Sequence, residues 1–113
     1  MKFKKTIAVD FDGVLNNYTG YDPHNLFTPR RGVEDFLKTL NKQYEVIIYS
    51  TRNKSDIEKW LLKYHLDKYI QRVTNNKPPA IAYIDDRAVR FNGSYSDCLE
   101  NLDEKAYWQK KED

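Results

Sequence analysis

The chain has 113 residues, of which 40% are hydrophobic and 32% charged, with a formal net charge of +2. This length predicts one domain over residues 1–113 with a modest hydrophobic core, and the composition excludes a disordered protein. A charge this close to neutral does not by itself indicate a nucleic-acid-binding protein.

The sequence also bears on where the protein works. Cys98 is the only cysteine, so an intrachain disulfide is excluded. Thr6–Val9, the apolar run near the start, is far shorter than the 7–15 apolar residues of a signal peptide or the roughly 20 of a membrane span. We therefore expect a cytoplasmic protein without a membrane segment.

The first half of the chain predicts two strands around one helix. Thr6–Val9 is apolar, ends at Asp10 and predicts a buried strand, and the polar residues 16–31 predict a loop. Glu45–Tyr49 predicts a second buried strand, which ends at Ser50. Between them, apolar residues at i, i+3, i+4 and i+7 predict an amphipathic helix. The residues that form this apolar face are Val33, Phe36, Leu37 and Leu40.

The second half predicts three more strands and two helices. A capping box at Ser55 predicts a helix start, and Tyr69–Val73, Ala80–Ile84 and Val89–Phe91 predict short strands. Asn92-Gly93 predicts a turn after the last of these. A final helix is predicted from the spacing of Tyr95, Cys98, Leu99 and Leu102, and a frayed tail is expected after Trp108.

Strands that alternate with helices predict the α/β class: a single Rossmann-like domain with a mainly parallel sheet of about five strands and helices on both faces. Ligands of such sheets bind beyond the carboxyl ends of the strands. Asp10, Ser50 and the pair Asp85-Asp86 follow predicted strands. These residues are therefore the first candidates for a functional site.

Asp10-Phe11-Asp12-Gly13 is the most informative segment. Two carboxylates at i and i+2 of an extended stretch point the same way, so Asp10 and Asp12 can reach one site. Gly13 allows a tight turn and a close approach of the backbone to a ligand. An ordinary acidic turn is the alternative interpretation.

Asp85-Asp86 follows another buried strand. Adjacent carboxylates repel each other and raise their own pKa values unless a cation offsets their charge. Oxygen ligands without nearby His or Cys favour Mg²⁺ over zinc. A surface turn that caps a helix is the alternative.

Ser50 and Lys77 complete the candidate residues. A hydroxyl at a strand end can donate to a phosphoryl oxygen, and a lysine can neutralise charge that develops on it. Thr51 offers a second hydroxyl, but Ser50 is preferred because it directly follows the strand. Each residue also has an ordinary role, Ser50 as a local backbone cap and Lys77 as a solvated surface charge.

The order Asp10-x-Asp12-Gly13, Ser50, Lys77, Asp85-Asp86 resembles the four motifs of haloacid-dehalogenase-like hydrolases, over residues 5 to about 91. The resemblance implies a phosphatase. Because only 37 residues separate Asp12 from Ser50, no cap domain fits there, and none fits after Lys77. The chain is therefore identified as a capless member.

The resemblance also implies roles. Asp10 would attack phosphorus and form an aspartyl-phosphate, and Asp12 would act as general acid and then general base. Ser50 and Lys77 would hold the phosphoryl oxygens. Asp10, the backbone carbonyl of Asp12, and Asp85 would bind Mg²⁺, with Asp86 as an alternative or supporting ligand.

The substrate is less constrained by the sequence. An open, capless site suits large substrates, and Ser50-Thr51-Arg52 resembles the phosphatase domain of polynucleotide kinases. This makes a nucleotide or a nucleic-acid end a candidate substrate beside small phosphate esters, with Gly13, Thr51 and Arg52 as substrate-binding residues. Tyr18 and Tyr21 could stack on a base or be ordinary surface tyrosines. No function is assigned to His24 or His65.

Three other functions stay open at this point. A phospho-accepting regulatory domain uses similar residues, although its acceptor aspartate lies on a middle strand after an earlier acidic pair. A phosphotransferase would use an acceptor hydroxyl in place of water. A non-catalytic binding module is disfavoured because every proposed catalytic residue is present.

Overall fold

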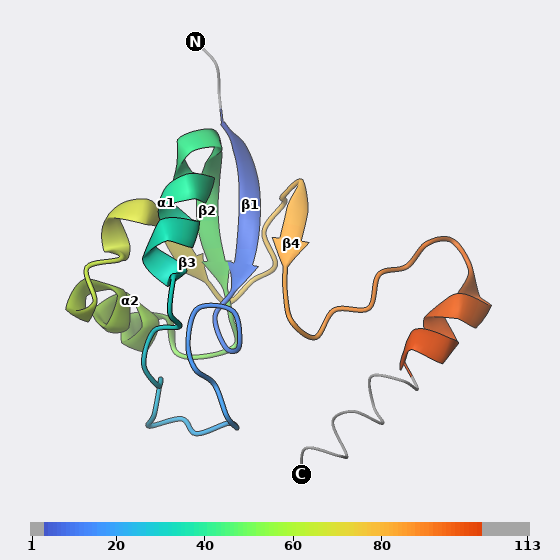
Figure 1. Cartoon of the computed structure of the whole chain (residues 1–113), viewed down its shortest axis with the longest axis horizontal. Helices are drawn as coiled ribbons and strands as arrows, with labels where there is room; N and C mark the ends of the chain where they lie inside the picture. The colour runs from blue at the N-terminus through green and yellow to red at the C-terminus, as the bar shows by residue number, and fades with distance from the viewer. Residues whose placement is uncertain (1–3, 103–113) are drawn as a thin grey trace.

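The structure of the protein is a computed structural model, which describes residues 4–102. The chain forms an α/β domain, as predicted (Figure 1). Its elements are β1 (Lys5–Asp10), α1 (Val33–Gln43), β2 (Tyr44–Tyr49), α2 (Lys54–Lys63), the 3-10 turn η1 (Asp67–Tyr69), β3 (Arg72–Thr74) and β4 (Ala82–Ile84). A further helix spans residues 95–102.

The four strands form one parallel sheet in the order β3-β2-β1-β4. Val9, next to the end of β1, lies opposite Ile48 of β2 and Ile84 of β4. The apolar runs of β1 and β2 are buried, as expected for the central strands of a parallel sheet. The predicted parallel sheet is confirmed, with four strands where about five were expected.

The missing strand is the one predicted at Val89–Phe91, which is not a strand in the described chain. The turn-forming pair Asn92-Gly93 leads into a helix and not into a hairpin. Ser94 accepts a hydrogen bond from the backbone N–H of Asp97 through its hydroxyl, at 3.2 Å, and from that of Cys98 through its carbonyl, at 3.1 Å. Ser94 thereby caps the helix at 95–102 and uses the turn as its start.

Two other predicted strands are shorter than expected. The first part of Tyr69–Val73 belongs to η1, whose turn is closed by a 3.1 Å hydrogen bond from the Ile70 N–H to the Asp67 carbonyl. Within Ala80–Ile84, pairing begins where the Ile81 N–H donates to the Thr6 carbonyl at 2.9 Å. Both limits are set by backbone hydrogen bonds, one within the η1 turn and one to β1, which hydrophobic periodicity does not encode.

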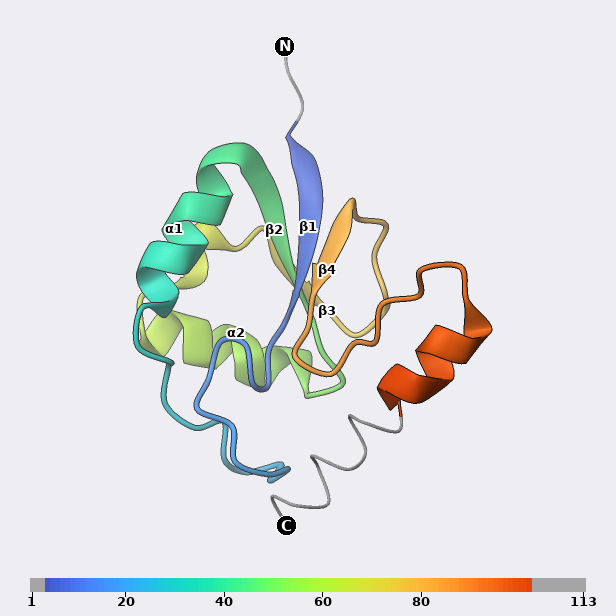
Figure 2. The ribbon, with the colours of Figure 1, turned by 45° about the vertical axis from the view of Figure 1, so that its right-hand side comes forward.

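The hydrophobic core lies on one face of the sheet. Ile7, Val9, Val46 and Ile48 alternate toward this face and pack against residues of both long helices, including Leu37. Figure 2 shows α1 and α2 on the same side of the sheet.

The two long helices, α1 and α2, therefore share one face of the sheet. The steps from β1 to β2 and from β2 to β3 run in the same direction across the sheet. Right-handed crossovers in one direction place both helices on one face. The connection that steps back across β1, residues 75–81, contains no helix, and is too short for a long one.

Helix α2 begins one residue before the predicted Ser55. Its N-cap is Asn53, whose side-chain oxygen accepts a 3.1 Å hydrogen bond from the Asp56 N–H. Asn and Ser are similarly good N-caps, so the sequence contained two possible starts.

We expect Asn53→Ala to lower the free energy of unfolding by about 1 kcal/mol, because it removes the oxygen that satisfies the Asp56 N–H. Ser55→Ala is the matched control and should change the free energy of unfolding by less than about 0.5 kcal/mol. Urea denaturation measures both. A larger loss in the Ser55 variant would show that Ser55 is the N-cap.

The described chain carries no cap domain, since only residues 11–32 join β1 to α1 and only residues 75–81 join β3 to β4. In the described part of the chain, no helix combines the length and apolar character that crossing a bilayer requires. The tail after Trp108, which was expected to fray, lies outside the described residues.

Candidate active site

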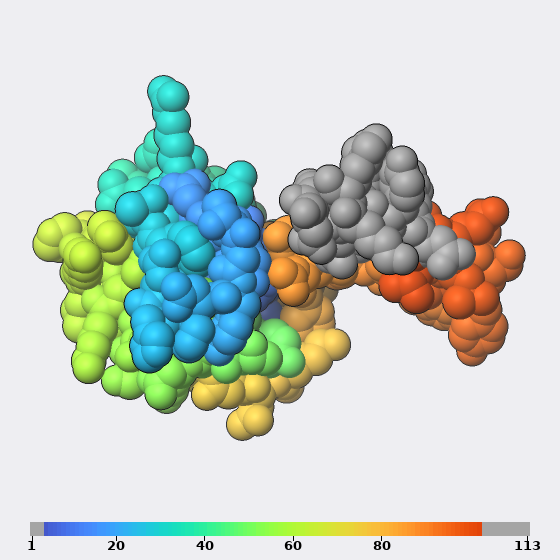
Figure 3. All heavy atoms as spheres, turned by 90° about the horizontal axis from the view of Figure 1, so that it is seen from below, coloured from blue at the N-terminus to red at the C-terminus, as the bar shows by residue number. Residues whose placement is uncertain are grey.

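The polar residues singled out in the sequence gather where the strands end. Figure 3 views the molecule from this end, and residues between β1 and α1 (blue to cyan) occupy much of the visible face. Residues 17–29, which we call the 17–29 loop, are closed at the base by a bridge between Asn16 and Pro29 and a 2.8 Å bond from the Asn17 N–H to the Thr28 carbonyl. This loop lies at the end of the sheet where a cap domain would otherwise cover the site.

Asp10, Asp85 and Asp86 form an acidic cluster, each with a carboxylate oxygen within 4.8 Å of the others. The register of the sheet explains the cluster. Val9 of β1 pairs with Ile84 of β4, so Asp10, the last residue of β1, and Asp85, the residue after β4, lie side by side at the carboxyl ends of the strands. Three acidic oxygens at this spacing are suited to a hard divalent cation.

Burial, together with the nearby carboxylates of Asp85, Asp86 and Asp12, raises the pKa of Asp10 to about 6. A 2.8 Å hydrogen bond from the Phe11 N–H to the Asp10 carboxylate opposes it. Repulsion within the cluster therefore adds to the desolvation of Asp10 in keeping it protonated to a higher pH than an ordinary aspartate. A bound cation would reverse the repulsive part of this effect.

Without metal, Asp10→Asn should stabilise the folded protein at pH 7. The native state holds the Asp10 proton more tightly than the unfolded chain, whose pKa is near 3.9, so the free energy of unfolding falls as pH rises from about 4 to 6. Asparagine removes this penalty and keeps an oxygen for the Phe11 N–H. Because solvent screens a half-exposed carboxylate, we expect a gain of about 1 kcal/mol.

Urea denaturation in chelator at pH 4 and pH 7 tests this expectation. The gain should be present at pH 7 and absent at pH 4, where the wild-type carboxyl is protonated in the folded state. Equal effects at both pH values would show that the effect does not come from the charge of Asp10.

Gly13 closes the turn after Asp12. Its φ of +84° is in the left-handed region that favours glycine, and the Asp86 carboxylate occupies the place of a side chain at this position. Gly13 is thus required for the approach of Asp86 to the turn. The structure explains its presence by packing, and its predicted role in substrate binding stays a prediction.

The Asp12 carboxylate is held away from the acidic cluster by two other side chains. Both of its oxygens accept hydrogen bonds from Nε of Arg52, at 2.8 and 2.9 Å, and Nδ2 of Asn16 donates to one of them at 2.9 Å. The Arg52 side chain is only 3% exposed. The carboxylate of Asp12 is thereby fixed in position and faces two donors.

The same two side chains hold the 17–29 loop. Asn16 is fully buried and also donates to the Leu26 carbonyl at 2.9 Å, while Nη1 of Arg52 donates to the Asp22 carbonyl at 2.8 Å. Sequence reasoning missed Asn16, because an asparagine at the start of a polar loop is also an ordinary turn residue. Arg52 thus connects Asp12 to the loop, and its predicted role in substrate binding stays a prediction.

The structure distinguishes the two candidate hydroxyls. Ser50 is buried, and its hydroxyl accepts a 3.1 Å hydrogen bond from the Arg52 N–H, whereas Thr51 is exposed. Because the Ser50 oxygen accepts, its hydrogen remains available to donate. Asn75, the residue after β3, supports this turn, since its Nδ2 donates to the carbonyls of Ser50 and Arg52, both at 2.7 Å.

Lys77 lies in the loop between β3 and β4. Its ammonium nitrogen is 4.6 Å from the centroid of the Tyr83 ring, a cation–π contact. The Tyr83 hydroxyl donates to the Pro78 carbonyl at 2.7 Å and so fixes the ring beside this loop. The predicted contact of Lys77 with a phosphoryl group stays a prediction.

A hollow of about 410 Å³ adjoins the acidic cluster on the α1 side. Its wall includes Phe36 and Ile84, with Arg30 and Arg31 at the rim. Nη1 of Arg30 donates to the Gly13 carbonyl at 3.2 Å. We call this space the α1 hollow.

A comparison with protein families decides the identity of this arrangement. The sequence model of the NLI interacting factor-like phosphatases matches residues 4–103. The chain belongs to the NLI interacting factor-like phosphatase family. Among curated proteins and solved structures, none matched the chain.

Membership of this phosphatase family confirms two predictions from the sequence. The family is of the haloacid-dehalogenase-like type, which agrees with a capless member, and its activity is that of a phosphatase. The acidic cluster of this phosphatase is consistent with the divalent metal that such enzymes use. As a phosphatase, the protein acts on phosphorylated substrates.

Proposed function

We propose that this phosphatase requires Mg²⁺ and cleaves phosphate monoesters through an aspartyl-phosphate intermediate on Asp10. The observation that carries the proposal is the arrangement of the carboxylates. Asp10 shares the acidic cluster with Asp85 and Asp86, while Asp12 is held separately by Arg52. This separation supports the assignment of Asp10 as the nucleophile beside the metal and of Asp12 as the group that transfers a proton.

The residues present fit a magnesium ion. The cluster offers oxygen donors only, and their mutual distances of 4.8 Å or less allow shared coordination with small side-chain adjustments. Asp10, Asp85 and Asp86 would hold the ion, with the backbone carbonyl of Asp12 as a further ligand. When bound, the ion offsets the negative charge that a phosphate ester would meet in this cluster.

The first step is an attack by an Asp10 carboxylate oxygen on phosphorus. The bond between phosphorus and the ester oxygen breaks, and a protonated Asp12 gives its proton to the departing oxygen. In the second step water attacks phosphorus, and Asp12 takes a proton from it. The bond between Asp10 and phosphorus breaks, which releases phosphate and restores the Asp10 carboxylate.

We assign the remaining roles by position. The Ser50 hydroxyl would donate to a phosphoryl oxygen, and Lys77 would neutralise charge on the transferred group. Arg52 and Asn16 would act as positioning residues, because both hold the Asp12 carboxylate. Thr51 would contact the substrate from the exposed side of the same turn.

The substrate is proposed to be a nucleotide or a nucleic-acid end. The cytoplasmic location expected from the sequence stays a prediction. Transfer to an acceptor hydroxyl in place of water remains the alternative reaction. It would appear as a phosphorylated product when alcohols such as glycerol are added, whereas hydrolysis gives free phosphate alone.

Phosphate release from p-nitrophenyl phosphate, in Mg²⁺ and in chelator, tests the proposed function. We expect turnover in Mg²⁺ and a loss of at least about 100-fold in chelator, because the carboxylates of the acidic cluster would otherwise repel the anionic substrate. Restoration by added Mg²⁺ is the control for irreversible damage. Equal rates with and without metal would contradict the proposal.

A further inference from the structure

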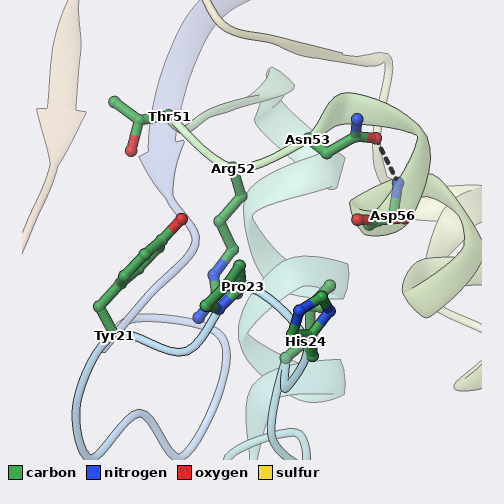
Figure 4. A pocket seen from close by; sticks show the side chains of 8 residues that line it. Tyr21, Pro23, His24, Thr51, Arg52, Asn53 and Asp56 are labelled. Carbon is green, nitrogen blue, oxygen red and sulfur yellow. Dashed lines mark hydrogen bonds between the residues drawn. The ribbon is translucent and has the colours of Figure 1, made fainter.

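A second pocket lies between the 17–29 loop and the start of α2, with a volume of about 270 Å³ (Figure 4). In Figure 4 the Arg52 side chain reaches from the turn after β2 toward the loop, with Tyr21 and His24 on either side. We call this space the Tyr21 pocket. The full lining consists of Tyr21, Pro23, His24, Leu26, Thr51, Arg52, Asn53 and Asp56.

The Arg52 guanidinium lies between the Tyr21 pocket and Asp12, the proposed proton donor. Nε of Arg52 contacts the Asp12 carboxylate at 2.8 Å, and the centre of the same guanidinium lies 5.4 Å from the Tyr21 ring centroid. In an in-line attack the leaving group departs opposite the nucleophile, next to the acid that protonates it. A leaving group protonated by Asp12 therefore emerges beside this pocket.

The walls of the pocket are suited to a flat aromatic ring. Tyr21 is 69% exposed, so much of its ring is accessible, and Figure 4 shows His24 beyond Pro23 and Arg52 on the other side of the pocket. Base–aromatic stacking contributes about 1–3 kcal/mol per base. The sequence left both Tyr18 and Tyr21 as candidates to stack on a base. Tyr21 is favoured here, since Tyr18 packs on Phe27, with ring centroids 5.8 Å apart.

The pocket also contains a polar group without a partner. Within the described chain, Nη2 of Arg52 is buried and has no hydrogen-bond acceptor. Such groups are rare in folded proteins, so this nitrogen is a donor that a ligand could satisfy. An aromatic ligand with ring nitrogens or carbonyl oxygens supplies the missing acceptor, and the Asp56 side chain at the rim accepts from amino groups.

We propose that the Tyr21 pocket binds the base of a nucleoside phosphate whose phosphate group is cleaved at Asp10. The inference rests on the proposed function, and it names the group that selects the substrate. A ring that stacks on Tyr21 and accepts from Arg52 distinguishes a nucleoside phosphate from a simple sugar phosphate.

The test compares nucleoside monophosphates with ribose 5-phosphate, which carries the phosphate and sugar but no base. For the wild type we expect kcat/KM to be at least about tenfold higher for the best nucleotide. Tyr21→Ala should reduce this ratio by about tenfold, mainly through KM. Phe36→Ala, which removes an aromatic side chain from the α1 hollow, is the matched control and should keep the wild-type ratio.

Three outcomes would overturn the inference. The first is an equal rate on both esters in the wild type. The second is a ratio that falls in Phe36→Ala and not in Tyr21→Ala, which would place the base in the α1 hollow. The third is a phosphoserine peptide whose turnover depends on Tyr21 while nucleotides are not selected, which would assign the pocket to a peptide.

A binding experiment separates this inference from the proposed reaction. Calorimetry on Asp10→Asn protein in Mg²⁺ measures the affinity for the same nucleotide and for ribose 5-phosphate without turnover. Tighter binding of the nucleotide that is lost in the Asp10→Asn, Tyr21→Ala double variant supports the pocket even if no ester is hydrolysed. Equal affinities for the two ligands overturn the pocket assignment even if the phosphatase is active.

Discussion

Asp10→Asn is expected to lower kcat/KM for p-nitrophenyl phosphate by at least about 10³-fold in Mg²⁺. Asparagine has nearly the same shape and keeps the acceptor for the Phe11 N–H, but its amide oxygen is a far weaker nucleophile. The variant should remain folded and become more stable without metal at pH 7. Loss of activity together with a gain in stability would separate a chemical role from a structural one.

Two comparisons make this result specific to Asp10. Asp35→Asn changes an exposed aspartate in the first turn of α1, and it should keep the wild-type rate within about twofold. Asp12→Asn should also be slow, but it retains the nucleophile, so phosphate from an activated ester should accumulate on the chain. Mass spectrometry of acid-quenched protein detects the added phosphoryl group, and its absence from Asp10→Asn identifies the acceptor. An Asp10→Asn rate near that of the wild type would contradict the proposed mechanism.

Arg52→Met is expected to lower the free energy of unfolding by about 2–3 kcal/mol. Removing one partner of a buried ion pair typically costs about 3–5 kcal/mol, and the Asp12 side chain, at 21% exposed, recovers part of this from solvent. The substitution also removes the bond that joins the 17–29 loop to Arg52, at the Asp22 carbonyl. Urea denaturation measures the change.

Arg31→Met is the matched control, because Arg31 is exposed and its loss should change the free energy of unfolding by less than about 0.5 kcal/mol. A double-mutant cycle with Asp12→Asn isolates the pair. Asp12→Asn should lower the free energy of unfolding much less in the Arg52→Met protein than in the wild type. Additive losses would mean that Arg52 stabilises the protein by its packing and its bond to the Asp22 carbonyl, and not by its contact with Asp12.

The structure also supports a distinction between residues that react and residues that place them. Asp10 and Asp85 meet because β1 and β4 are neighbours in register, while Asp12 is oriented by Arg52, which lies 40 positions later in the chain. Arg52 and Asn16 contact both Asp12 and the 17–29 loop. A substrate that moves the loop would therefore act on the position of Asp12 through these two side chains.

The sequence by itself determined the elements whose cause is local. Sequence patterns predicted the buried strands β1 and β2, the apolar stripe of α1 and the acidic pair after β4. The alternation of strands with helices predicted the parallel sheet. The family followed from four motifs in order, because each motif is a short segment at a strand end. These features depend on periodicity and on neighbours in the chain, which a sequence contains directly.

Only the tertiary structure decided what depends on distant partners. Whether Val89–Phe91 pairs as a strand depends on the free edge of β4, and local hydrogen bonds to Ser94 favour a helix start after it. The role of Arg52 depends on a contact with Asp12 and on the fold of the 17–29 loop. Such contacts carry no local periodicity, since they are fixed by how the strands are ordered and by which buried polar groups must find partners.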